Sequence, residues 1–310
     1  MEEKLYQETP LFKSHKLQME RGLNVFYKME CFQPTNSFKI RGMDTFCRFH
    51  VKQGHKNFIS SSGGNAGYSM AYAAMKLNSK VKVVVPKTTS HFMKQKIETL
   101  NAEVVVFGDA WDDAHQHALE LAKIENAIYV PPFDDELLWQ GHSTIIDECF
   151  EQMPQPDKLI VSVGGGGLLC GILMGLKKHG WTKTQIITTE TKGAASFYES
   201  FKANKIIELK EINTIATTLG AKKITPKALE LAKEFNISPF VMDDEMAIEA
   251  TTLFAKEYNT LVEPACGAAL SAVYFDNELI TPNDTILVIA CGGANQNFFN
   301  YLHCFITCHS

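Results

Sequence analysis

Short, almost continuous apolar runs alternate along this chain with segments in which apolar side chains recur at helical spacing. Strands are predicted at 22–29, 57–60, 81–85, 103–107, 128–130, 159–163, 186–190, 240–242 and 285–290. Helices are predicted at 66–77, 92–100, 111–123, 137–149 and 244–258. Apolar strands separated by amphipathic helices are typical of a parallel sheet that is covered on both faces. The pattern therefore predicts an α/β fold.

One lysine stands at the start of a further predicted helix. Residues 34–37 predict a turn that offers a hydroxyl or an amide as an N-cap, and Lys39 follows directly after Phe38. The helix dipole and the apolar neighbour both disfavour the ammonium form of this side chain. A lysine that loses its proton easily can form a Schiff base. Taken alone, however, the stretch fits an ordinary lysine near a helix N-terminus better.

Two loops of small residues point to anion binding. Residues 60–67 and 164–167 each follow a predicted strand and precede a predicted helix, so each directs backbone N–H groups toward a ligand. Four consecutive glycines at 164–167 suit a phosphate, and the loop 60–67 suits a carboxylate and a group that needs an amide donor. A dinucleotide-binding loop is the alternative for 164–167, with Glu190 as its acidic residue, but that fingerprint requires spaced glycines.

Several segments together resemble the serine/threonine dehydratase family of pyridoxal-phosphate enzymes, which has fold type II and is tryptophan-synthase-β-like. They are SFKIRG at 37–42, SSGGNAG at 61–67, PPFDD at 131–135, SVGGGGLLCG at 162–171, LVEPACGAAL at 261–270 and CGGAN at 291–295. The resemblance is greatest to the short, eukaryote-type L-serine dehydratase/L-threonine deaminase group. It implies two open, twisted, mostly parallel sheets, with a large cofactor-binding domain at 1–42 and 137–310 and a small domain at 43–136.

The resemblance also implies a set of site residues. Lys39 would hold pyridoxal 5′-phosphate covalently and remove the proton from the substrate Cα. Further cofactor contacts are expected from Phe38, Asn65, Gly164, Gly165, Gly166, Gly167, Leu168 and Cys291, and substrate contacts from Ser62, Gly63, Asn65 and Ala66. Taken singly, Asn65 fits a turn residue better, and a buried core cysteine is the commoner role for a residue such as Cys291. At Gly63 the family pattern also accommodates alanine, so turnover and specificity depend on this position.

A monovalent cation, K⁺, is the second expected ligand. The resemblance implies that it is bound by Gly164, Glu190, Ala194, Ser196, Leu219 and Ala221. A surface glutamate is the alternative for Glu190, but this residue follows a predicted buried strand. Near the C-terminus, His303, Cys304, Cys308 and His309 match no closed zinc site, and we interpret them as part of the core or of an interface.

Composition narrows the classes of function. The 310 residues have a net charge of −5 and no strongly basic stretch, so nucleic acid and anionic membranes are not expected partners. The chain shows no apolar run of membrane-spanning length and no secretory signal pattern at its N-terminus. Its 8 cysteines are scattered, as expected for reduced thiols of a cytoplasmic protein.

The expected reaction is β-elimination from L-serine, and from L-threonine, to pyruvate or 2-oxobutanoate and ammonia. The resemblance further implies a homodimer with a place in amino-acid metabolism and gluconeogenesis. A serine racemase, a β-replacement synthase and a catalytically weak amino-acid-binding protein are the alternatives on the same scaffold. Because the chain ends at residue 310, we also expect no isoleucine-type feedback control.

Overall fold

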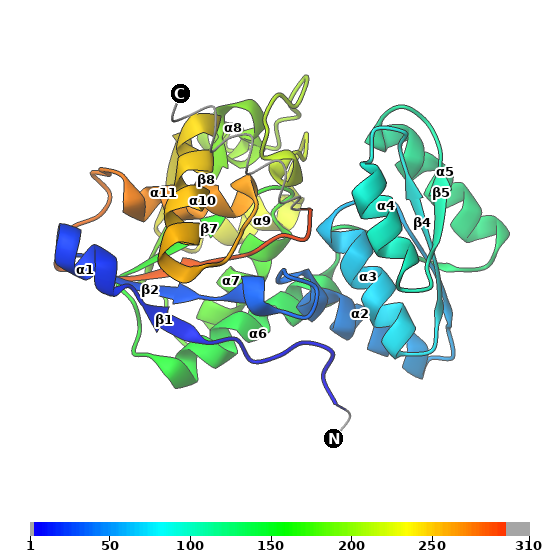
Figure 1. Ribbon diagram of the computed structural model, residues 1–310, viewed down its shortest axis with the longest axis horizontal. Coiled ribbons are helices and arrows are strands. Elements are labelled where there is room, and N and C mark those ends of the chain that lie inside the picture. The colour runs from blue at the N-terminus through cyan, green and yellow to red at the C-terminus, as the bar shows by residue number, and fades with distance from the viewer. Residues whose placement is uncertain (1–2, 296–310) are drawn as a thin grey trace.

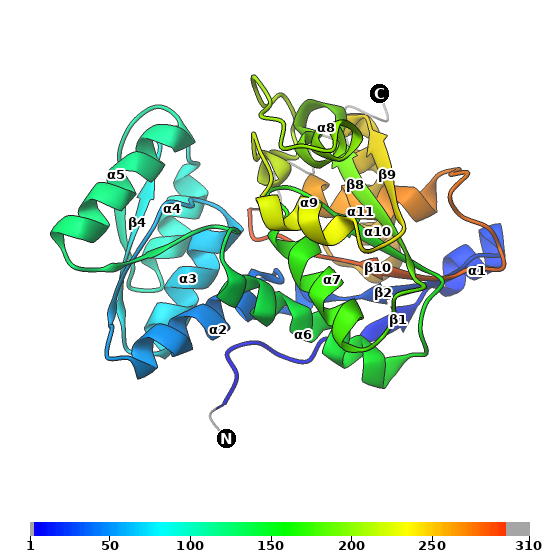
Figure 2. The ribbon, with the colours of Figure 1, turned by 180° about the vertical axis from the view of Figure 1, so that it is seen from behind.

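The computed structural model describes residues 3–295 and contains two sheets (Figures 1 and 2). The larger sheet has six strands, in the spatial order β1 (Leu11–Lys13), β2 (Asn24–Lys28), β10 (Thr285–Ile289), β7 (Lys158–Ser162), β8 (Gln185–Thr191) and β9 (Ile237–Met242). β1 pairs antiparallel with β2, and all other neighbours are parallel. Residue Pro239, which cannot donate to a ladder, lies on the edge strand β9.

The smaller sheet has four parallel strands, in the order β5 (Glu103–Val106), β4 (Lys80–Val85), β3 (Asn57–Ser60) and β6 (Ile128–Val130). All four strands fall within the predicted small domain 43–136. The boundaries of the two domains remain a prediction, and α2 (Lys39–Lys52) runs through the first of them. The predicted α/β fold with two mostly parallel sheets is confirmed.

Helices cover both sheets. The smaller sheet is accompanied by α2, α3 (Asn65–Lys76), α4 (His91–Glu98) and α5 (Trp111–Ile124). The larger sheet is accompanied by α1 (His15–Arg21), α6 (Glu136–Gln152), α7 (Gly167–Lys178), α8 (Ser196–Ala203), α9 (Pro226–Ala232), α10 (Asp244–Tyr258) and α11 (Pro264–Tyr274). None of the helices in residues 3–295 is long and apolar enough to cross a membrane.

The apolar runs read from the sequence become the central strands of the larger sheet. Residues Ile286, Leu287, Val288 and Ile289 of β10 are completely buried, and so are Leu159, Ile160 and Val161 of the neighbouring β7. Strands covered on both faces need apolar side chains at successive positions, which explains the absence of alternation in these segments.

The predicted polar N-cap of α2 is wrong. The N-cap position of α2 is Phe38, which makes no side-chain capping bond, and the Ser37 hydroxyl has no hydrogen-bond partner among the described residues. The turn instead pairs with another segment, because Ser37 forms an antiparallel bridge with Gly292. Asp243 occupies the N-cap position of α10, but its carboxylate pairs with Lys192 at 2.7 Å.

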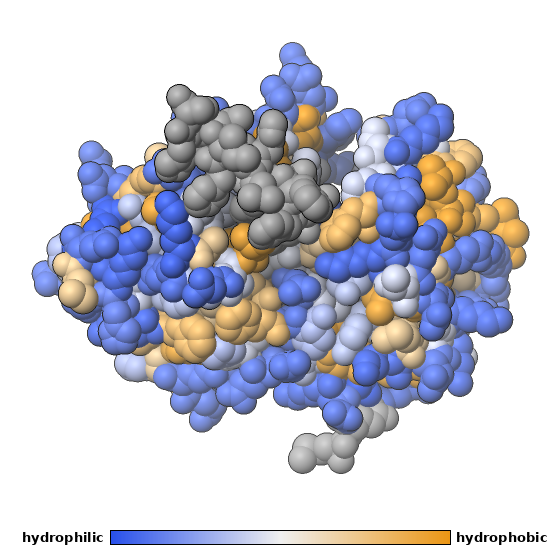
Figure 3. Space-filling view, viewed as in Figure 1, coloured by the Kyte–Doolittle hydropathy of each residue, from blue (hydrophilic) through white to orange (hydrophobic). Residues whose placement is uncertain are grey.

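Hydrophilic side chains cover most of the face shown in Figure 3, with apolar side chains at the end formed by α5 and β5. Val106, Phe107 and Trp111 are exposed there. Among the described residues β5 is the last strand of the smaller sheet, so this apolar group lies along a sheet edge that no described strand pairs with.

A largely buried ion cluster surrounds Arg41 in the first turn of α2. Its guanidinium donates twice to Glu30, at 2.7 Å each, and twice to Glu148 of α6, at 2.6 and 2.8 Å. Lys28 at the end of β2 pairs with the same Glu148 at 2.6 Å. Burial alone would raise the pKa of Glu148, but hydrogen bonds from Arg41 and Lys28 hold this pKa below its ordinary value. The cluster ties β2 and α6 to the start of α2.

We predict that Arg41→Met lowers the free energy of unfolding by about 3–5 kcal/mol, because it leaves the buried carboxylate of Glu30 without its cation and leaves Glu148 with Lys28 alone. Urea unfolding of the variant and the wild type measures this difference. The matched control is Lys87→Met, which removes an exposed pair with Asp109 and should cost about 0–1 kcal/mol. Equal losses in the two variants would contradict a structural role for the cluster.

Candidate active site

Three segments with candidate chemistry follow three adjacent strands of the larger sheet. Lys39 follows β2, Cys291 follows β10, and the glycines 164–167 follow β7. These strands are neighbours and parallel, so their carboxyl ends lie at one edge of the sheet, where open α/β folds bind ligands. Backbone bonds fasten two of the segments together, because Phe38 N donates to Cys291 O at 3.3 Å and Gly293 N donates to Asn36 O at 2.7 Å.

Lys39 is the first residue of α2, and its amine occupies a desolvated position. Nζ donates to the carbonyl oxygen of Pro132 at 2.7 Å and lies 5.2 Å from the centroid of the Phe38 ring. Burial lowers the pKa of Lys39 from 10.5 to about 8. A substantial fraction of this amine is therefore neutral near pH 8, as a nucleophile or a base requires.

The four glycines form a tight turn that leads into α7. Gly166 has a φ of +90°, a conformation that side chains disfavour. A Cβ at Gly165 or Gly167 would collide with Phe133, and one at Gly164 would lie 3.2 Å from Leu219. The first N–H groups of a helix have no partner within it, so the turn and the adjoining Leu168 present donors suited to an anion.

The loop 61–67 connects β3 to α3 and is closely packed. A Cβ at Gly67 would collide with the carbonyl oxygen of Ser62, so this position requires glycine. A Cβ at Gly63 would lie 2.6 Å from Thr89 Cγ2 and 2.7 Å from its Oγ1. Alanine at residue 63 therefore needs a shift of Thr89 in this chain. Ala66 is buried in the first turn of α3.

Asn65 begins α3, and its side chain reaches the part of the molecule built on the larger sheet. Oδ1 accepts a bond from Ala294 N at 2.6 Å, and Nδ2 donates to the two oxygens of Glu263 at 3.1 and 3.2 Å. Asn65 is therefore more than a turn residue. Glu263 was not predicted as a site residue, although a lone acid in the apolar segment 261–270 is a visible signal in the sequence.

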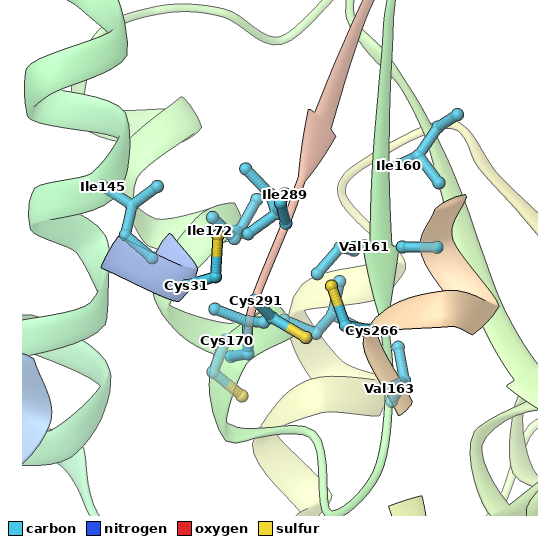
Figure 4. Packing of buried hydrophobic residues seen from close by; sticks show 14 of the residues in the cluster. Cys31, Ile145, Ile160, Val161, Val163, Cys170, Ile172, Cys266, Ile289 and Cys291 are labelled. Carbon is cyan, nitrogen blue, oxygen red and sulfur yellow. The ribbon is translucent and has the colours of Figure 1, made fainter. Parts of the chain in front are cut away.

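Cys291 is buried beside Cys266 of α11, as Figure 4 shows. A hydrogen bond with Cys266 and burial raise the pKa of the Cys291 thiol well above its ordinary value, so this group stays protonated. Cys31 and Cys170 lie in the same packed region (Figure 4). The sequence did not indicate that Cys266 lies next to Cys291, because Cys266 belongs to α11 whereas Cys291 follows β10.

Glu190 was expected to follow the end of a strand. It lies inside β8 instead. Its oxygens accept bonds from Phe197 N at 2.8 Å and Tyr198 N at 2.7 Å, in the first turn of α8. Burial raises the pKa of Glu190 from 4.5 to about 8. In residues 3–295 no basic side chain pairs with this carboxylate, and the buried hydroxyl of Ser196 has no partner.

The other residues expected at a cation site lie in the same region. Ala194 and Leu219 belong to one small apolar cluster, and Leu219 lies against Gly164. Leu219 O accepts a bond from Ala221 N at 2.7 Å. The described part of the chain contains no group of three His, Cys, Asp or Glu side chains that could hold a metal ion. His303, Cys304, Cys308 and His309 lie outside the described residues.

Comparisons with known proteins agree on one family. The family described as pyridoxal-phosphate dependent enzyme matches residues 3–292. A human protein named L-serine dehydratase/L-threonine deaminase is 41% identical over 303 residues, covering 94% of this chain and 92% of its own length. An L-serine dehydratase of Dictyostelium discoideum is 41% identical over 296 residues, covering 90% and 84%. The crystal structure of a fungal L-serine ammonia-lyase from Rhizomucor miehei is 36% identical, with a TM-score of 0.92 and coverage of 98% and 99%.

The lowered pKa of Lys39 predicts how the rate of its reaction with the cofactor depends on pH. In cofactor-stripped protein, the rate of covalent attachment of pyridoxal phosphate should rise with pH to a midpoint near the Lys39 pKa of about 8, because only the neutral amine attacks. Stopped-flow absorbance at constant cofactor concentration measures this rate. Nα-acetyl-lysine, as the control, should show a midpoint near about 10.4. The same midpoint in protein and control would contradict desolvation of Lys39.

Proposed function

Because this chain belongs to the pyridoxal-phosphate-dependent enzyme family, we propose that it is an L-serine/L-threonine ammonia-lyase. It converts L-serine to pyruvate and ammonia, and L-threonine to 2-oxobutanoate and ammonia. The observation that carries the proposal is the position of Lys39, a desolvated amine at the sheet edge where the glycine turn and Cys291 converge.

The residues at this edge fit pyridoxal phosphate. The glycine turn 164–167 has no room for side chains, and its N–H groups with that of Leu168 would hold the phosphate. Lys39 would attach the cofactor, Phe38 would cover one ring face, and Asn65 would donate to the phenolic oxygen. The protonated Cys291 would face the ring nitrogen. When bound, the cofactor supplies an electron-withdrawing ring that stabilises negative charge at the substrate Cα.

The chain supplies positioning and proton transfer. The loop with Ser62, Gly63, Asn65 and Ala66 would hold the substrate carboxylate through its N–H groups at the start of α3. The Lys39 amine would take the Cα proton, and the carbonyl of Pro132 holds this amine in place. Phe38, whose ring centroid lies 5.2 Å from the amine, would exclude water from it. A neutral Cys291 thiol does not hold the ring nitrogen protonated as an aspartate would, which favours prompt elimination.

Two other outcomes on the same scaffold remain alternatives. A serine racemase returns D-serine, and a β-replacement synthase consumes a second nucleophile. Both need the same lysine and the same cofactor contacts, so only the products separate them from a lyase. A catalytically weak amino-acid-binding protein is the third alternative, and it would give no turnover.

The proposal extends to the cellular setting. The chain would act as a homodimer in the cytoplasm and supply pyruvate for gluconeogenesis. Its similarity to L-serine dehydratases supports this setting. All six cysteines in the described residues are unpaired, which is usual in reducing compartments.

A monovalent cation near Glu190 is the second ligand that we propose. A buried carboxylate without a basic partner is costly, and the unpartnered Ser196 hydroxyl beside it is a further oxygen ligand. Carbonyl oxygens of Gly164, Ala194, Leu219 and Ala221 would complete the site. Large monovalent ions tolerate such loose sets of oxygen ligands better than Mg²⁺, which requires a regular octahedron.

We predict that Lys39→Ala abolishes formation of 2-oxo acid from L-serine and L-threonine, and removes the absorbance band of the lysine-bound cofactor, while the fold persists. The amine is the expected site of attachment and the expected base, so no other group replaces it. The wild type is assayed for pyruvate, D-serine and, with an added thiol, a β-substituted product. D-serine or the thiol adduct as main product would overturn the lyase assignment, and normal turnover of the variant would overturn the role of Lys39.

The pH dependence of stability in different monovalent salts tests the proposed cation site. With a pKa raised from 4.5 to about 8, folded Glu190 binds more protons than unfolded Glu190 in this range, so its contribution to stability falls as pH rises. A bound cation would lower this pKa and remove the loss. We therefore expect the melting temperature and the activity at pH 8 to be higher in potassium or ammonium than in sodium or lithium, and the difference in melting temperature to vanish at low pH.

Two variants isolate this effect. Glu190→Gln should abolish both the pH dependence and the difference between potassium and lithium. Glu234→Gln, which alters an exposed glutamate paired with Lys177, should keep both. Equal melting curves of the wild type in matched potassium and lithium buffers at pH 8 would count against a functional cation site.

A further inference from the structure

Glu263 lies at the junction of the two sheet-based parts of the molecule and is 3% exposed. It occupies the N-cap position of α11 but makes no side-chain capping bond there. Its carboxylate instead accepts bonds from three other segments. They are the two contacts from Asn65 Nδ2, one from Thr218 Oγ1 at 2.7 Å and one from Asn295 N at 2.8 Å.

These contacts determine the orientation of the Asn65 amide. Oδ1 accepts from Ala294 N at 2.6 Å, while Nδ2 faces the carboxylate of Glu263. A flipped amide would set its donor against the Ala294 N–H and its acceptor against the carboxylate, so one orientation is strongly preferred. The amide carries two N–H bonds, and a single one can serve both carboxylate oxygens. The second N–H is then left for a ligand.

Asn65 and Glu263 come from different parts of the fold. Asn65 begins α3 beside the smaller sheet, whereas Glu263 precedes α11 beside the larger one. A second contact spans the same junction nearby, because Lys96 of α4 donates to Ala294 O at 3.0 Å. The approach of the two parts and the orientation of the amide therefore depend on the same group of contacts.

We propose that Glu263 is a positioning residue that acts through Asn65. Its carboxylate holds α3 against the start of α11 and keeps one amide N–H directed into the site. This inference rests on the proposed function for the group that receives the N–H, the phenolic oxygen of the cofactor. The link between α3 and α11 is a property of the protein without cofactor.

The first test therefore uses cofactor-stripped protein. Glu263→Gln keeps the size of the side chain but replaces one acceptor oxygen by a donor, so a single oxygen remains for the donors of Asn65, Thr218 and Asn295. Hydrogen exchange of the amides of Tyr68, Ser69 and Met70 in α3 should become at least about fivefold faster. Exchange in β7 and β10 should not change, which shows that the fold is retained.

The control is Glu257→Gln in α10. Glu257 accepts bonds from the hydroxyls of Ser14 at 2.5 Å and Tyr274 at 2.8 Å, and neither partner belongs to the smaller-sheet part. This variant should leave the exchange of α3 unchanged. Unchanged exchange of α3 in Glu263→Gln, or equal acceleration in every element, would overturn the proposed link.

The second test measures the dissociation constant of pyridoxal phosphate in Glu263→Gln, Asn65→Ala and the double variant. If Glu263 acts through Asn65, each single variant weakens binding by at least about tenfold, and the double variant binds no more weakly than Asn65→Ala. If the loss of affinity in the double variant equals the product of the two single losses, Glu263 acts independently of Asn65 and the proposal is overturned. Failure of the wild type to bind the cofactor would refute the proposed function, whereas the exchange experiment would still decide on the link.

Discussion

The position of the reactive lysine depends on the ion pairs that the buried guanidinium of Arg41 makes with two carboxylates. Arg41 stands two residues after Lys39 and is held by Glu30, which follows β2, and by Glu148 of α6. A buried ion cluster of this kind adds little net stability relative to an apolar replacement, but removal of one partner is costly. Its effect here is geometric, because it fixes the first turn of α2 relative to the larger sheet. The lysine amine is therefore placed before any ligand binds.

The edge of the larger sheet then assembles the site. β2, β10 and β7 are adjacent and parallel, so the segments that follow them meet without long connections. Backbone bonds between 36–38 and 291–293 keep Phe38 and Cys291 together. The edge combines an amine of lowered pKa, a thiol of raised pKa and a turn without side chains. Burial lowers the pKa of the amine, a hydrogen bond and burial raise the pKa of the thiol, and close packing excludes side chains from the turn.

The second contribution comes from the smaller sheet. The loop 61–67 approaches the edge from the other side, and Asn65 is its contact with Glu263 and Ala294. The site is thus shared between two separately built parts, and its geometry depends on how closely they approach. Within the smaller-sheet part the loop is also closely packed, because Thr89 fills the space that an alanine side chain at residue 63 would need.

The sequence by itself determined the class of fold and the glycine turn 164–167, because apolar periodicity and glycine runs are local properties of a chain. Lys39 and Cys291 were assigned through the resemblance of their segments to a known family, since each residue taken alone fits an ordinary structural role equally well or better. The sequence also missed contacts, since Asn65 and Glu263 are 198 positions apart and Arg41 and Glu148 are 107 apart. Such pairs depend on strand order and on the crossing of helices, which no local pattern specifies. The same reason explains why Phe38 replaced the expected polar cap of α2, because the preceding turn is held by its bridge to Gly292.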